Sequence, residues 1–203
     1  MDEHHITTVE ELEALYGKPA GASVAKEIDH ISQGYRALIE AAPFVVIATC
    51  GRDGLDCSPK GDPAGFVRIL DDKTLAIPDR RGNNRIDGFR NIVRDPRVAL
   101  LFLIPGVGET LRVNGRAVIS TDPKLIESFA VDGKPPRTVM IVTIESIFFH
   151  CSKAVVRSHL WDNKIDRKSL PSTGTIIAEL TSGQLGGETY DREAPQRIKE
   201  QLY

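Results

Sequence analysis

The sequence predicts a mainly β protein in which an antiparallel sheet closes into a barrel with helices on its flanks. Two observations carry this prediction. Apolar, β-branched runs follow one another at short spacing and are separated by hairpin-type turns. The regular alternation of strands and helices that a doubly wound fold requires is missing. The pair Gly106 and Gly108 lacks the third glycine of a dinucleotide-binding fingerprint and carries little weight.

Two helices are expected before the first strand. Thr8 and Glu11 fit a capping box, and apolar residues recur at helical spacing as far as Gly17. A second helix is expected from about residue 23 to residue 42, because apolar residues again share one face and Pro43 limits the helix at its end.

The hydrophobic period changes to that of strands after Pro43. The run FVVIATC (44–50) leads into a turn at Arg52-Asp53-Gly54, and a strand follows this turn. Further strands are expected at 65–70, 74–78, 97–104, 110–120 and 138–151, with a short helix near 123–130. We expect one domain over residues 1–203, with N-terminal helices at 8–42 and a helical tail at 171–203.

Charge and hydropathy exclude several classes of function. The formal net charge of −2 is not the basic excess that nucleic-acid binding usually requires. The longest apolar run near the N-terminus, residues 43–50, is far too short to span a bilayer. The acidic, amphipathic stretch up to residue 17 is unlike a secretory signal. We therefore expect a cytoplasmic protein that binds neither nucleic acid nor membrane.

A metal site is not expected. Cys50, Cys57 and Cys151 contain no C-x-x-C pair, and the five histidines share no ligand spacing. Structural metal sites draw their ligands from such pairs, so neither a metal centre nor a disulfide framework is predicted.

A basic loop precedes a short amphipathic segment that ends at Asp95-Pro96. Its polar residues are Arg80, Arg81, Asn83, Asn84 and Arg85. Helix N-termini offer unpaired N–H donors, and arginine adds forked donors that match phosphate oxygens. The loop therefore predicts a phosphate-binding site, with a solvated basic turn as the alternative.

Five stretches of the chain, taken in order, resemble a known family. They are SPKGDPAGFV (58–67), IPDRRGNNRIDGFRNI (77–92), DPRVALLFLIPG (95–106), ETLRVNGRA (109–117) and FHCSKAVVRSHLW (149–161). Together they resemble the pyridoxamine 5′-phosphate oxidase-like, FMN-binding split-barrel proteins, and most of all an uncharacterised subgroup described as FMN-dependent enzymes. The resemblance implies a six-stranded split barrel and a homodimer that holds FMN at its interface.

The resemblance also implies a phosphate end of the site. The loop at 79–85 would hold the FMN phosphate, with Asp79, Arg80, Asn83 and Arg85 among the cofactor-binding residues.

Ser58 and Lys60 belong to a strand that the resemblance implies lies beside the flavin. A lysine near the N1 side of the ring would stabilise negative charge on the reduced cofactor. The alternative is an exposed ion pair between Lys60 and Asp62, which would contribute less than about 1 kcal/mol.

A second group of site residues follows from the later stretches. Thr110 and Arg112 match a strand on which the oxidases carry a cofactor-binding Gln, and Lys153 and Arg157 share one helix face. The resemblance implies that the second subunit brings this region to the flavin edge, where Trp161 could cover the ring. Arg112 facing water and Trp161 packing in the core or the interface are the alternatives.

The function expected from the resemblance is that of an FMN-dependent oxidoreductase of unknown substrate. No catalytic residue is assigned, because the protein would supply binding and electrostatics to the flavin. A non-catalytic flavin-binding module and a haem- or deazaflavin-binding relative stay open as alternatives. Oxidation of pyridoxine phosphate is disfavoured, because residues 122–136 hold neither the Tyr nor the Arg of the true oxidase's substrate site.

Overall fold

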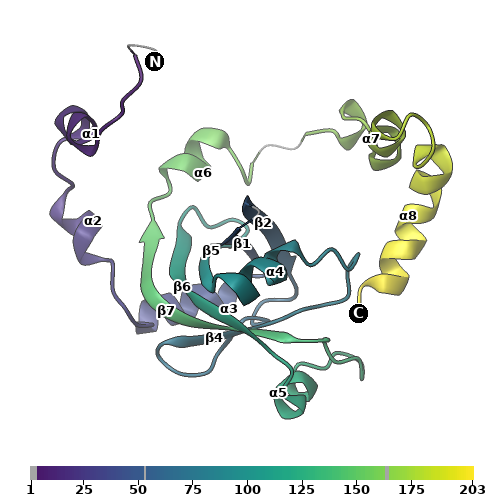
Figure 1. Ribbon diagram of the computed structural model, residues 1–203, viewed down its shortest axis with the longest axis horizontal. Helices are drawn as coiled ribbons and strands as arrows, with labels where there is room; N and C mark the ends of the chain where they lie inside the picture. Colours follow the sequence, from purple (N-terminus) through teal and green to yellow (C-terminus); the bar gives the residue numbers. More distant parts are fainter. Residues whose placement is uncertain (1–3, 53, 163–164) are drawn as a thin grey trace.

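The computed structural model describes residues 4–52, 54–162 and 165–203, so Asp53 of the predicted turn lies outside the described residues. The described part of the chain forms one seven-stranded antiparallel sheet with helices around it (Figure 1). The strands are β1 (Phe44–Gly51), β2 (Gly54–Gly61), β3 (Arg68–Ile69), β4 (Thr74–Pro78), β5 (Arg97–Leu103), β6 (Thr110–Ser120) and β7 (Val139–His150). The helices are α1 (Val9–Tyr16), α2 (Gly21–Ala25), α3 (Gln33–Ala41), α4 (Asp87–Arg94), α5 (Pro123–Ser128), α6 (Lys153–Ser158), α7 (Thr173–Leu180) and α8 (Gly187–Gln201), with a 3-10 turn at Arg167–Ser169.

The predicted mainly β, antiparallel fold with flanking helices is confirmed, but the strand count and the closure are corrected. The strand order is β2-β1-β5-β6-β7-β4-β3, so the sheet has seven strands and does not close through hydrogen bonds between its described edges. The expected strand at 65–70 shrinks to Arg68 and Ile69, because the turn that contains Pro63 and Gly65 delays its start.

The single helix expected over residues 23–42 is wrong. The chain forms α2 and α3 instead, and between them Ile28 makes an isolated bridge to Ile147 of β7. The hydroxyl of Ser32 accepts a hydrogen bond from the backbone N–H of Tyr35 at 3.2 Å and so starts a new helix at this point. The apolar residues read as one helix face therefore belong to separate segments. α2 has no buried residue, whereas Tyr35 and Ile39 of α3 are buried in the core.

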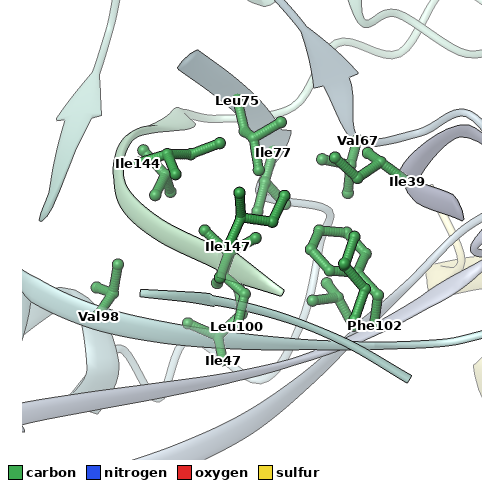
Figure 2. Close-up of a cluster of buried hydrophobic side chains, with 14 of the residues drawn as sticks. Ile39, Ile47, Val67, Leu75, Ile77, Val98, Leu100, Phe102, Ile144 and Ile147 are labelled. Carbon is green, nitrogen blue, oxygen red and sulfur yellow. The ribbon is translucent and has the colours of Figure 1, made fainter. Parts of the chain in front are cut away.

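Alternation along the strands builds the core. Val45 and Ile47 of β1 face the interior together with Leu100 and Phe102 of β5. Figure 2 shows Ile47, Leu100 and Phe102 in one cluster with side chains of β4 and β7. A bulge between Asn114 and Gly115 interrupts the pairing of β6 with β7. Along β1 and β5 every second side chain is therefore buried in the core, and the side chains between them lie on the outer face of the sheet.

Two helical segments extend away from the sheet on opposite sides (Figure 1). α1 begins at the predicted capping box of Thr8 and Glu11, and none of its residues is buried. On the other side α7 and α8 follow the 3-10 turn, and Tyr203 after α8 returns to contact the residue that follows β2, Asp62. Among the described residues no helix combines the length and the apolar character needed to cross a bilayer.

A candidate anion site at the start of helix α4 and a basic groove on the opposite face

Four of the predicted site residues line one cavity beside the first turn of α4. They are Ser58, Lys60, Asp79 and Arg85. The cavity has a volume of about 70 Å³, and Ile47 and Met140 are among its apolar lining residues. This volume is well under the roughly 300–1,000 Å³ of ordinary ligand pockets, so it can take only part of a larger molecule.

The period of two along β2 explains why these side chains converge. Asp56, Ser58 and Lys60 share one face of the strand. The Ser58 hydroxyl donates to the Asp56 carboxylate at 2.8 Å. Asp56 was not among the predicted residues, although its position two residues before Ser58 was a sufficient signal.

Helix α4 is fixed against β1 by a buried polar contact and lies close to β2. The amide nitrogen of Asn91 donates to the hydroxyl of Thr49 at 3.1 Å. A Cβ on Gly88 would lie 2.8 Å from a carboxylate oxygen of Asp56, so the first turn lies close to this side chain of β2. The N-cap residue Ile86 supplies no side-chain hydrogen bond. The first-turn N–H groups therefore keep their capacity to bind an anion.

Three cations of the predicted cofactor site, Lys60, Arg80 and Arg85, each have a carboxylate partner. Lys60 pairs with Asp79. Arg80 Nε lies 2.7 Å from the Asp62 carboxylate, and Arg85 Nε lies 2.5 Å from that of Asp87. The alternative ion pair between Lys60 and Asp62 is wrong, because Asp62 is occupied by Arg80.

Arg80 and Asn83 lie apart from Arg85. Arg80 and Asn83 line a separate hollow against Tyr203, and the Arg80 side chain is only 17% exposed. The Asn83 side-chain oxygen accepts a hydrogen bond from the Arg85 backbone N–H at 3.0 Å. The Arg85 side chain is 79% exposed at the mouth of the cavity. Of the three arginine and asparagine side chains first expected at the phosphate, the structure thus brings only Arg85 to the cavity.

Four of the five remaining predicted residues form a second group, in a groove of about 570 Å³. Thr110, Arg112, Lys153 and Arg157 line it together with His150. Its floor includes Val46 and Ala48, whereas Ile47 and Thr49 line the first cavity. Because neighbouring residues of a strand point to opposite faces, the groove and the cavity lie on opposite faces of β1. A single chain therefore cannot bring both groups to one ligand.

The groove is strongly basic. No acidic side chain lines it, and within the part of the chain that the structure describes Arg112, Lys153 and Arg157 form no ion pair. The Arg112 guanidinium lies 5.1 Å from the ring centroid of Phe148. Burial lowers the pKa of His150, and the charges of Arg112 and Lys26 lower it further. The groove therefore combines free positive charge with an apolar floor.

Trp161 lines neither hollow. Its indole N–H donates to the Val107 carbonyl at 2.7 Å and so ties the end of the predicted stretch to the loop between β5 and β6. His159 has a left-handed backbone, with φ of 50°, and ends α6. Arg157 thus points to the groove while His159 serves as the cap. In residues 4–52, 54–162 and 165–203 no group of three or more His, Cys, Asp or Glu side chains is placed to hold a metal.

Comparisons with known proteins cover part of the chain. A family model described as pyridoxamine 5′-phosphate oxidase matches residues 31–151. Among solved structures, HupZ of Group A Streptococcus is 23% identical, with 60% of this chain and 95% of that chain covered and a TM-score of 0.50. A protein of Clostridium acetobutylicum related to general stress protein 26, of the pyridoxinephosphate oxidase family, is 17% identical, with 58% and 86% covered and a TM-score of 0.42. A chain described as F420 reductase is 21% identical, with 59% and 98% covered and a TM-score of 0.43. No curated protein sequence matches significantly.

Proposed function

This chain belongs to the pyridoxamine 5′-phosphate oxidase family, since the family model matches residues 31–151, and on that premise we propose that it is an FMN-dependent oxidoreductase. The observation that carries the proposal is the start of α4. An N-cap without a side-chain hydrogen bond opens onto a cavity that Arg85 and Lys60 line. This combination of backbone N–H groups and cations suits the phosphate of a flavin nucleotide.

The donor set fits the phosphate end of FMN. Arg85 stands at the cavity mouth, where a phosphate could share its guanidinium with Asp87. The acidic side chains in and beside this cavity, Asp56, Asp79 and Asp87, are held by hydrogen bonds or ion pairs. The cavity is too small for the flavin ring, so the ring must extend beyond it.

A second copy of the chain would complete the site. Arg112, Lys153 and Arg157 lie on the opposite face of β1, so they reach a flavin at α4 only from another protomer. Their charges have no carboxylate partners among the described residues, and they would stabilise negative charge at the ring edge. We therefore propose a homodimer with a split-barrel protomer and one flavin at each of two equivalent interfaces.

The bound flavin would supply hydride or electron transfer, and the protein residues would bind and orient it. Lys60 would hold its ammonium near the ring, and the Lys60–Asp79 pair fixes that side chain. No side chain is assigned as an acid or base, in keeping with a reaction whose chemistry resides in the cofactor.

The absorption spectrum of the purified protein, followed by FMN titration, tests this function. We expect an oxidised-flavin spectrum and steady consumption of NADH or NADPH when an electron acceptor is present. A Soret band would instead indicate haem, and preferential binding of a deazaflavin would indicate that cofactor. FMN binding without turnover on any donor would indicate a flavin-binding module.

A further inference from the structure

We propose that Tyr203 is a positioning residue that holds the loop at 80–85, and with it the start of α4, in the geometry that binds phosphate. We call the contact formed by Tyr203, Asp62 and Arg80 the latch. The proposal rests on the proposed function, because it assigns a role to the latch at the same phosphate site.

One carboxylate joins the three residues of the latch. The Tyr203 hydroxyl donates to one oxygen of Asp62 at 2.6 Å, and Arg80 Nε donates to the other at 2.7 Å. The side chain of Asp62 is only 4% exposed. A carboxylate so buried depends on its donors. Loss of the Tyr203 hydroxyl leaves one carboxylate oxygen without its hydrogen bond, and loss of Arg80 leaves the charge without compensation.

Two further contacts of Arg80 strengthen the latch. Its Nη1 donates to the Phe129 carbonyl at 2.8 Å. Its guanidinium carbon lies 5.4 Å from the ring centroid of Tyr203, within reach of a cation–π interaction. The hydrogen bond to Asp62 raises the pKa of the Tyr203 phenol, so the hydroxyl stays protonated and can donate at neutral pH. Arg80 is therefore held from three sides.

The latch acts on the phosphate site through the backbone. Arg80 directly follows Asp79, whose carboxylate pairs with Lys60 in the cavity. Residues 81–86 after it are all exposed and lead straight into α4. Within that loop the Arg85 backbone N–H donates to the Asn83 side chain at 3.0 Å, and from outside it the Arg137 guanidinium donates to Asn84 at 2.8 Å. The latch fixes the end of this exposed loop at Arg80, and the contact from Arg137 holds its middle.

The variant Tyr203→Phe tests the latch, because it removes one hydroxyl and keeps the ring. Affinities for FMN and for riboflavin, which lacks the phosphate, are measured by flavin fluorescence. We expect FMN binding to weaken by about tenfold, the effect of losing one hydrogen bond to a charged group, with riboflavin binding unchanged. Amide hydrogen exchange over residues 80–86 should become faster. Tyr190→Phe, on α8 with its ring against Arg197, is the matched control and should change neither affinity nor exchange.

Two results would overturn the proposal, and only the second would also overturn the proposed phosphate site. If wild-type protein prefers FMN to riboflavin and Tyr203→Phe keeps the same preference, the latch has no positioning role while the phosphate site stands. If wild-type protein binds FMN no more tightly than riboflavin, the phosphate site itself is wrong and the latch loses its role with it.

Discussion

Lys60 of β2 and Asp79, the residue after β4, form an ion pair between strands that are not neighbours in the sheet. β2 lies at one edge of the strand order and β4 lies next to the other edge. Side chains therefore span the gap that strand pairing leaves open. The pair of Asp62 with Arg80 repeats the connection just beyond the end of β2. The candidate phosphate site lies at this junction.

Reversing the charge at the mouth of the cavity should weaken flavin binding. Arg85→Glu places a carboxylate where the FMN phosphate is proposed to lie, so we expect FMN affinity to fall at least about tenfold. Arg85 is exposed, and the fold should stay intact. Fluorescence titration with FMN measures the affinity, and circular dichroism checks the fold.

Arg81→Glu is the control for that variant, because Arg81 lies in the same loop but outside the cavity. An equal loss of FMN affinity in both variants would point to a general effect of loop charge. An unchanged affinity in Arg85→Glu would remove Arg85 from the site.

Removing the lysine charge should make the bound flavin harder to reduce. A cation near the ring favours the negatively charged reduced form, so Lys60→Gln should lower the reduction potential of bound FMN by about 30 mV, which corresponds to about 1.4 kcal/mol for two electrons. A dye-coupled redox titration measures this shift. Lys60→Arg keeps the charge and should retain most of the wild-type potential, whereas equal potentials in all three proteins would place Lys60 away from the ring.

The bulge in β6 should tolerate no side chain at Gly115. A Cβ there would lie 2.1 Å from the Thr143 carbonyl oxygen, so one of two paired strands must move. We expect Gly115→Ala to destabilise the fold by about 1–3 kcal/mol, measured by urea denaturation. Gly82→Ala has no atom within 4 Å of the added Cβ and serves as the control. Similar stabilities for the two variants would contradict the bulge geometry.

Acid should weaken the contact between the segment after α2 and the turn before β4. The Lys73 ammonium donates to Asp29 at 2.6 Å and, with His30, lowers the pKa of Asp29 to about 2. Because this pKa lies below the unfolded value of about 3.9, the contribution to stability is complete above that value and is lost as the pH falls toward 2. Urea denaturation from pH 5 to pH 2 should therefore show a shallower loss of stability in Asp29→Asn and in Lys73→Gln. If both variants lost stability with falling pH as steeply as the wild type, the contribution assigned to the Asp29–Lys73 pair would be wrong.

The strands were predictable because their residues carry a local signal. Alternation along 110–120 and 138–151 matches β6 and β7 closely. The helix expected at 23–42 failed because periodicity cannot detect the Ser32 cap or the bridge from Ile28 to a strand more than a hundred residues away. Closure of the sheet was likewise not predictable, since it depends on which strands pair.

The sequence indicates which residue types the candidate site contains but not their arrangement. Ser58 and Lys60 are two residues apart, so they lie on one face of β2. The strand pairing alone decides that Arg112 lies on the other side of β1, and no local pattern shows that Asp62 contacts Tyr203. The sequence favoured Arg80 as a phosphate ligand because no local pattern shows that it pairs with the buried carboxylate of Asp62.

A crystal structure of the protein grown with FMN tests the central claim most directly. The account predicts the phosphate within hydrogen-bond distance of the first-turn N–H groups of α4 and of Arg85, with the ring against Arg112 and Arg157 of a second copy. A phosphate seated in the basic groove beside Lys153, with no ligand at the start of α4, would contradict it.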